Sequence, residues 1–187
     1  LDNSDLTSGA TQTTDTSYTP GSEKSEASHT LYVQESDGTN WSSSGSREIV
    51  IDTTAPTASV TTATITNSGN AVVQSTETGT AYLVNTAVSV SNLANITGAA
   101  DNQQNSVAIS SASTDTNLAA TGLVEGTYKV YAVDAAGNLS NASSNSVTLD
   151  TTAPAITGTT VTSNNASIAV TFSEAVYNTS GGSGALE

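Results

Sequence analysis

The sequence contains no cysteine and no methionine, and among its 187 residues only three basic side chains stand against 17 acidic ones. Without cysteine, the chain forms neither a disulfide framework nor the usual cysteine-ligated structural zinc site. The net charge of -14 repels nucleic acid and anionic lipid surfaces, because both are themselves negatively charged. The composition therefore predicts no nucleic-acid partner.

Long apolar segments are also absent from the sequence. No run approaches the roughly 20 apolar residues that a spanning helix needs, so we expect no membrane insertion. The chain begins at Leu1, which is not followed by a basic segment and an apolar one. We therefore expect any signal peptide to lie outside this stretch, and we interpret the chain as a fragment of a longer protein.

The residues that do dominate are Ser, Thr, Asn, Val and Gly, and no stretch sustains apolar residues at helical spacing over three turns. Apolar residues instead alternate with polar ones, which is the period of a half-buried strand. In residues 127–133 this alternation predicts that Tyr128, Val130 and Ala132 face a core, whereas Lys129 and Tyr131 face outward. The sequence thus predicts an almost entirely β protein.

An internal repeat gives the organisation of the chain. The pentapeptide Asp-Thr-Thr-Ala-Pro begins at Asp52 and again at Asp150, 98 residues later. This spacing is about the length of one immunoglobulin-like sandwich. The sequence before the first copy, from Thr30 onward, parallels the sequence from Thr127, and the residues leading to Glu77 parallel those leading to Glu174. We infer three units.

The first unit, residues 1–52, is interpreted as the C-terminal part of a repeat, residues 53–150 as one complete repeat, and residues 151–187 as the N-terminal part of the next. Turns rich in Gly and Asn separate the expected strands of the complete unit. These strands are expected at residues 58–65, 71–75, 80–85, 87–92, 106–110, 117–121, 127–133 and 145–149. The predicted fold is an immunoglobulin-like Greek-key β-sandwich, with one complete domain flanked by two partial ones.

Three motifs occur in a fixed order. They are Ser-Thr-Glu-Thr-Gly-Thr-Ala-Tyr at 75–82, Val-Asp-Ala-Ala-Gly-Asn at 133–138 and Asp-Thr-Thr-Ala-Pro at 150–154. Over nearly its whole length, the chain resembles the bacterial Ig-like tandem repeats of large surface adhesins secreted by type I systems, of the biofilm type. The resemblance implies an extracellular or cell-surface location, neighbouring repeats of the same chain as partners, and extended rods stiffened by calcium at domain junctions. It implies no particular ligand.

The topology of such a sandwich predicts where the acids lie. The start of the first strand and the loops joining strands two to three and six to seven share one end of the domain. Asp52, Glu77 and Asp134 occupy these places, so we expect them to converge. Calcium takes six to eight oxygen ligands, and three carboxylates with backbone carbonyls and water would supply them. By the same logic Asp150 and Glu174 belong to a second site, whose third acid is expected beyond residue 187.

A plainer interpretation of these acids stays open. An aspartate at the mouth of a tight turn commonly accepts hydrogen bonds from its own loop, and Glu77 also fits a solvated loop residue. Further acids at the opposite end of a domain are secondary candidates; these are Glu23, Glu26, Asp101 and Glu125. Pro56 and Pro154 make each junction a short extended connection and not a flexible coil.

Catalysis is not expected. His29 is the only histidine, and we interpret it as an exposed loop residue because Gly126 stands at the matching position of the next unit. Trp41 matches Leu139, which favours a packing role over a sugar platform. An isopeptide crosslink would need a buried lysine, but Lys129 is predicted to face outward.

Two functions remain after these exclusions. The first is a structural extender of a surface adhesin, supported by the repeat, the short linkers and the junction acids. The second is a module that binds glycan or protein through its own surface, for which Tyr82 and Tyr131 are the aromatic candidates.

Overall fold

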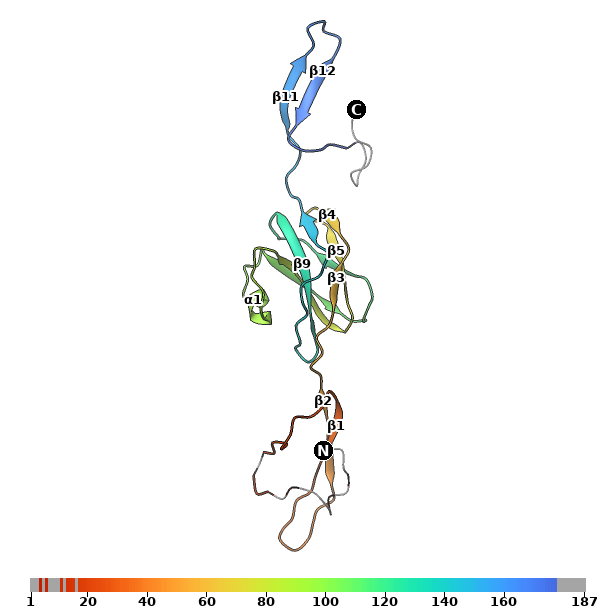
Figure 1. Cartoon of the computed structure of the whole chain (residues 1–187), viewed down its shortest axis with the longest axis vertical. Helices are drawn as coiled ribbons and strands as arrows, with labels where there is room; N and C mark the ends of the chain where they lie inside the picture. Colours follow the sequence, from red (N-terminus) through yellow and green to blue (C-terminus); the bar gives the residue numbers. More distant parts are fainter. Residues whose placement is uncertain (1–3, 5, 7–10, 12, 16, 178–187) are drawn as a thin grey trace.

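The computed structural model describes residues 4, 6, 11, 13–15 and 17–177, and these form three groups of strands along one extended molecule (Figure 1). A hairpin near the N-terminus is followed by a compact middle unit, and a second hairpin lies beyond it. The described residues are mostly β-strand, so the all-β prediction is confirmed. None of the helices in the described part of the chain has the length and apolar character to cross a membrane.

Two sheets build the middle unit, which we define as residues 53–150. The five-stranded sheet has the order β4-β10-β9-β6-β7 and the three-stranded sheet the order β3-β5-β8. Their bounds are β3 Ala58–Val60, β4 Ala63–Ile65, β5 Asn70–Ser75, β6 Gly79–Asn85, β7 Gln104–Ile109, β8 Thr116–Ala119, β9 Gly126–Asp134 and β10 Val147–Leu149. All neighbouring pairs are antiparallel except β4 and β10, which are parallel.

The core lies between these two sheets. Strands β3, β5 and β8 contribute Val60, Val73 and Leu118, and the facing sheet contributes Leu83 and Tyr128, all almost fully buried. In β9 the alternation predicted from sequence is confirmed, because Tyr128, Val130 and Ala132 are buried whereas Lys129 and Tyr131 are partly exposed. Burying a side chain of this size contributes about 1.5–3 kcal/mol of stability.

Two predicted strands of the middle unit are wrong in part or whole. The strand expected at 58–65 is divided, because the chain leaves β5 after Val60 and then joins β10 as β4. The strand expected at 87–92 does not form; a turn leads into the helix α1, Leu93–Thr97. Asn92 and Asn95 form a reciprocal capping box at its start, and Ile96 is buried. A helix of five residues is too short to show a helical period in sequence.

The two hairpins are antiparallel pairs. The first joins β1, Ala27–Val33, to β2, Gly45–Ile51, and the second joins β11, Ile156–Val161, to β12, Ile168–Phe172. Because the described parts of the flanking units hold only these two-stranded sheets, many of their apolar side chains are exposed.

The structure corrects the interpretation of His29 but not that of Trp41. His29 is only 8% exposed and belongs to β1, not to a loop. Its Nε2 lies 2.8 Å from the carbonyl oxygen of Ser25, as the hydroxyl of Tyr128 lies 2.6 Å from that of Val124. His29 therefore corresponds to Tyr128, two residues away from the sequence-based match. Trp41 is 58% exposed, in a unit whose described part holds only two strands, so its predicted packing role stays a prediction.

Candidate metal centre at the first linker

Three acids from separate elements meet where the first hairpin joins the middle unit. Asp52 directly follows β2, Glu77 lies in the turn between β5 and β6, and Asp134 ends β9. One carboxylate oxygen of each lies within 4.8 Å of the others. The structure thus brings together the three residues that the topology argument selected, whereas their binding of a metal stays a prediction.

Strand pairing and one glycine hold Glu77 close to Asp134. In the antiparallel pair of β6 and β9, Gly79 lies opposite Asp134. Gly79 has a φ of +151°, and a Cβ at this position would lie 2.0 Å from the carbonyl oxygen of Val133. Only glycine permits this approach, so the Glu-Thr-Gly turn is a condition for the site.

Asp134 organises the loop that follows it. Its Oδ1 accepts hydrogen bonds from the backbone N–H groups of Gly137, at 2.7 Å, and Asn138, at 2.8 Å. Burial raises the pKa of Asp134, but these bonds, with that from the Asn138 side chain, outweigh it and hold the pKa below the ordinary value. The carboxylate is therefore ionised and fixed in direction before any ligand arrives.

Asn138 connects this loop to the linker, a role that sequence analysis missed. Its Nδ2 donates to Oδ2 of Asp134 at 2.9 Å and to the backbone oxygen of Asp52 at 3.1 Å. One amide thus ties the linker residue Asp52 to a loop of the middle unit. The available signal was the Asp-Ala-Ala-Gly-Asn motif itself, whose Asn also fits an ordinary turn position.

The pKa of Glu77 is shifted in the opposite direction to that of Asp134. Desolvation by burial raises its pKa above the ordinary value, and the negative charges of Asp52, Asp134 and Glu26 raise it further. Three carboxylates crowded in this way repel one another. A divalent cation bound between them would remove this repulsion, and the all-oxygen donor set suits a hard cation.

Glu26, treated above as a secondary candidate, contacts the linker directly. Its carboxylate accepts hydrogen bonds from the hydroxyls of Thr53, at 3.0 Å, and Thr54, at 2.7 Å. The bond from Thr54 contributes most to keeping the pKa of Glu26 low. We call this arrangement, one Glu with two linker Thr hydroxyls, the Glu-Thr-Thr clamp.

A second clamp recurs one repeat later. Glu125 accepts hydrogen bonds from the hydroxyls of Thr151, at 3.2 Å, and Thr152, at 2.6 Å. These bonds lower the pKa of Glu125, and the bond from Thr152 contributes most. The remaining secondary candidates, Glu23 and Asp101, are exposed.

The second predicted site does not form a cluster of three acids among the described residues. Asp150 accepts a hydrogen bond from the backbone N–H of Thr152 at 3.0 Å, as Asp52 does from Thr54 at 3.1 Å. Glu174 follows β12, and its Oε1 is buried without a hydrogen-bond partner among the described residues. The third acid of this site was expected beyond residue 187, so its ligand set stays a prediction.

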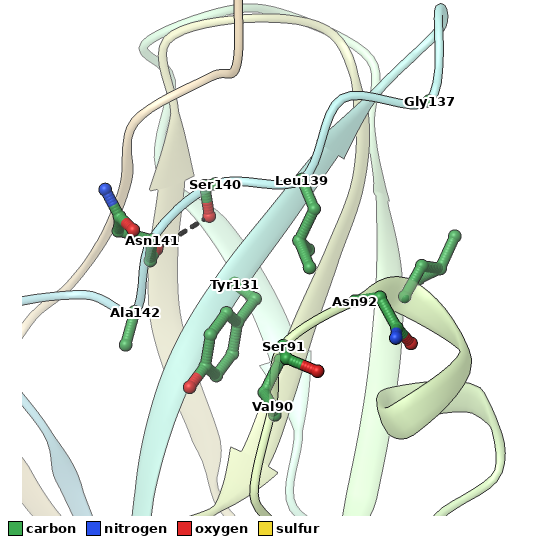
Figure 2. A pocket seen from close by; sticks show the side chains of 10 residues that line it. Val90, Ser91, Asn92, Tyr131, Gly137, Leu139, Ser140, Asn141 and Ala142 are labelled. Carbon is green, nitrogen blue, oxygen red and sulfur yellow. Dashed lines mark hydrogen bonds between the residues drawn. The ribbon is translucent and has the colours of Figure 1, made fainter.

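A separate groove of about 450 Å³ lies on the outer side of the five-stranded sheet. Figure 2 shows the ring of Tyr131 between the segment leading into α1 and the segment after β9. Its lining mixes apolar side chains with hydroxyls and amides; it includes Val90, Ser91, Asn92, Leu139 and Asn141. Tyr82, the second aromatic candidate, lies opposite Tyr131 on β6 but does not line the groove.

Comparison with known proteins found no matching protein-family model and no curated protein or solved structure with significant similarity to the chain.

Proposed function

We propose that the chain is a structural extender from a tandem array of Ig-like Greek-key domains in a secreted or cell-surface adhesin, stiffened by Ca²⁺ at the first linker. The observation that carries this proposal is the convergence of Asp52, Glu77 and Asp134 at the junction between two β units. A cation held there would join the linker to two loops of the middle unit. Neighbouring repeats of the same chain are the proposed partners.

The topology of the middle unit supports the Ig-like assignment. An A-B-E sheet facing a sheet that contains C, F and G is the arrangement of immunoglobulin-like sandwiches. With β3, β5 and β8 as A, B and E, and β6, β9 and β10 as C, F and G, the strand orders match. Tyr128, near the start of β9, donates a hydrogen bond to the backbone oxygen of Val124, and a bond of this kind at this place supports the assignment because it resembles the tyrosine corner of immunoglobulin-like domains.

The linkers support the extender. Each is a short segment ending in proline, held at its start by a Glu-Thr-Thr clamp. The two hairpins lie at opposite ends of the middle unit along the length of the molecule (Figure 1). Calcium suits this site better than magnesium, because Ca²⁺ accepts irregular oxygen geometry whereas Mg²⁺ demands a near-ideal octahedron.

Thermal unfolding of the 187-residue chain in calcium and in chelator tests the proposal. Weak extracellular calcium sites have dissociation constants of about 10⁻⁴ to 10⁻³ M. At a calcium concentration 100 times Kd, binding to the folded state adds about 2.7 kcal/mol. We therefore expect the Tm of the middle unit to rise by roughly 10 °C or more, and the length measured by X-ray scattering to be better defined.

A matched control uses Asp101→Asn, which removes one exposed acid away from the site. This variant should keep the calcium effect, whereas Glu77→Gln should lose most of it. If calcium changes neither the Tm nor the scattering profile of the unmodified chain, stiffening by calcium is rejected. A well-defined molecular length in chelator would then mean that the Glu-Thr-Thr clamps and the prolines alone stiffen the linker.

The raised pKa of Glu77 predicts a pH dependence. Its folded-state pKa lies above the ordinary 4.5, so without metal the folded protein binds this proton more tightly than the unfolded chain does. The stability from Glu77 is therefore present at acidic pH and is lost as pH rises through the raised pKa. Calcium competes with the same proton, so calcium affinity should fall as pH is lowered from 7 toward 5.

Calorimetric titrations at several pH values would measure this effect. Glu77→Gln should flatten the pH dependence of the remaining affinity. In metal-free protein the same substitution should remove the stability gain on mild acidification. Below pH 4 the opposite trend sets in, because the lowered pKa of Asp134 makes its contribution disappear as that carboxylate is protonated.

The groove at Tyr131 favours a second candidate function, binding of a neutral glycan by the middle unit. Its volume falls within the range of small-molecule sites, and an aromatic ring beside amides and hydroxyls suits a sugar. Titration of ¹⁵N-labelled chain with neutral oligosaccharides would test it. Tyr131→Ala should abolish any shifts, while Tyr82→Ala, on the neighbouring strand, should not; absence of shifts at millimolar sugar rejects this function.

A further inference from the structure

We propose that the outer edge of strand β7 pairs with the same edge of a second copy of this chain, in antiparallel orientation and centred on Ser106. The pairing joins the five-stranded sheets of two middle units into one continuous sheet. It involves neither the cation at the first linker nor the groove at Tyr131. It therefore stands or falls separately from the functions proposed above.

Strand β7 is the longest of the four edge strands of the middle unit, a unit that the structure describes from end to end. The edges are β4 and β7 in one sheet and β3 and β8 in the other. Strands β3 and β4 have three residues and β8 has four, whereas β7 has six. Proteins commonly protect long edges with charged residues, proline or a bulge, because unpaired backbone groups invite further pairing. Strand β7 has none of these three features.

Asparagine side chains cover two of the other edges. The amide of Asn105 donates to the backbone oxygens of Ala119, at the end of β8, and Thr121, just beyond it, at 3.0 Å each. The amide of Asn145 donates to the backbone oxygen of Val60 in β3 at 3.3 Å. Among the described residues no side chain covers the edge of β7 in this way. This strand is therefore the edge that remains open to a partner.

One hydrogen bond shows which backbone groups of β7 point outward. The N–H of Asn85 donates to the carbonyl oxygen of Gln103 at 2.9 Å, so these residues form a hydrogen-bonded pair at the end of the β6–β7 ladder. Such pairs recur at every second residue of an antiparallel ladder, so the odd-numbered residues of β7 bond to β6. The backbone groups of the even-numbered residues, Gln104, Ser106 and Ala108, therefore point away from β6, and within the described part of the chain nothing bonds to them.

These three outward residues are complementary to themselves. In an antiparallel pair centred on Ser106, this residue faces its own copy, and Gln104 faces Ala108 of the other molecule. The pair would form about six backbone hydrogen bonds, two for each hydrogen-bonded pair of residues. The side chains of Ser106 and Ala108 are small and exposed, so the second strand can approach closely.

The distribution of charge favours a second copy over a foreign peptide. Two molecules of net charge -14 repel each other over most of their surface. No charged residue lies between Asp101 and Asp115, so within the paired strands no acid faces an acid. An edge without acids also has nothing with which to attract a cationic strand. A second copy supplies a neutral strand of matching length and hydrogen-bonding pattern.

The direction of the strands determines how the two molecules would lie. The strands of the middle unit run along the length of the molecule, as β3 and β9 do (Figure 1). Antiparallel pairing of β7 therefore places two molecules side by side and pointing in opposite directions. Because the same edge of each copy is used, the contact has two-fold symmetry and closes at a dimer.

Sedimentation velocity of the 187-residue chain in chelator, from about 10 μM to about 1 mM to span weak association, tests the proposal. The mass should rise from 18.7 kDa toward twice that value and no further. Raising the salt concentration from about 0.02 to about 0.5 M should strengthen the dimer severalfold, because salt screens the repulsion between the two acidic molecules. A chain that stays monomeric, one that grows beyond a dimer, or a dimer that weakens with salt overturns the proposal.

A pair of charge variants, Ser106→Asp and Ser106→Lys, tests the register. Position 106 faces itself across the two-fold axis, so each variant alone brings like charges together and should stay monomeric. An equimolar mixture brings opposite charges together and should restore a dimer that contains one copy of each. If the mixture stays monomeric, or if either variant dimerises alone, β7 does not pair with itself in this register and the proposal is wrong.

The matched control is Ser106→Ala, which changes the same exposed position without adding charge. It should dimerise as the unmodified chain does. Circular dichroism of all three variants should show an unchanged Tm of the middle unit at a concentration where the chain is monomeric, which excludes misfolding as the cause of lost association.

Amide hydrogen exchange followed by NMR would observe the edge directly. In dilute solution the N–H groups of Ser106 and Ala108 should exchange rapidly, whereas those of Asn105 and Val107 are protected by their bonds to β6. When about nine-tenths of the chain is dimeric, exchange at Ser106 and Ala108 should slow by about tenfold. A dimer that leaves these two N–H groups unprotected associates through another surface and overturns the proposal.

Discussion

Gly79→Ala should lower the free energy of unfolding of the middle unit by roughly 3 kcal/mol, the combined scale of a strained backbone and an overpacked contact. The added Cβ would lie 2.0 Å from the carbonyl oxygen of Val133 and 2.9 Å from Cα of Asp134, at a φ of +151°. Both atoms belong to the backbone of the central strand β9, so neither can move aside cheaply. Urea unfolding, followed by far-UV circular dichroism, would measure the loss of unfolding free energy.

The matched control is Gly122→Ala. Gly122 also has a positive φ, +84°, but a Cβ there would have no neighbour within 4 Å. Gly122→Ala should lower the free energy of unfolding only by the cost of holding an alanine at a positive φ, about 1–2 kcal/mol. If both substitutions cost the same, close packing of β6 on β9 is not what demands glycine at position 79. The calcium effect should also weaken in Gly79→Ala alone, because Glu77 moves away from Asp134.

Substitution of Asp134 should separate the two roles of this residue. Asp134→Asn keeps an oxygen that accepts from the N–H groups of Gly137 and Asn138, so in chelator it should lose only about 1 kcal/mol. Asp134→Ala leaves these groups without their acceptor and should lose about 2–3 kcal/mol. In calcium, both variants should lose most of the rise in Tm that we expect for the unmodified chain.

The comparison of these two variants is the decisive part. A metal role requires that both variants respond much less to calcium than the unmodified chain does, although they differ from each other in chelator. If Asp134→Asn retains the full calcium response, the carboxylate serves only to shape its loop, which is the plainer interpretation left open by the sequence. Isothermal titration with calcium would provide an independent measure of affinity.

Strand positions and the convergence of acids could be predicted because they follow from period and topology. The alternation of Tyr128, Val130 and Ala132 requires no knowledge of distant contacts, and a sandwich places Asp52, Glu77 and Asp134 at one end whatever its details. By contrast, α1 depends on a local capping box between Asn92 and Asn95. Side-chain hydrogen bonds of this kind do not appear as a hydrophobic pattern.

The misassigned histidine has a different cause. Aligning Asp37 with Asp134 in the loop that follows matches His29 to Gly126, but the first hairpin has two more residues between its Glu and that Asp. Counting from Glu26, which contacts the linker as Glu125 does, gives the match to Tyr128. A local insertion shifts register in sequence, whereas strand pairing in three dimensions retains it. The bridging role of Asn138 was missed because it depends on Asp52, 86 residues away.

The Glu-Thr-Thr clamp joins the residue directly before a strand, Glu26 or Glu125, to the chain segment that leaves the same unit. Part of what sets the direction in which the polypeptide leaves a unit therefore lies within that unit itself. In the proposed tandem array, insertion or loss of a whole unit would then change the length of the array and leave the path of the remaining units as it was. An array built in this way would vary in length by recombination between repeats while each linker kept its contacts.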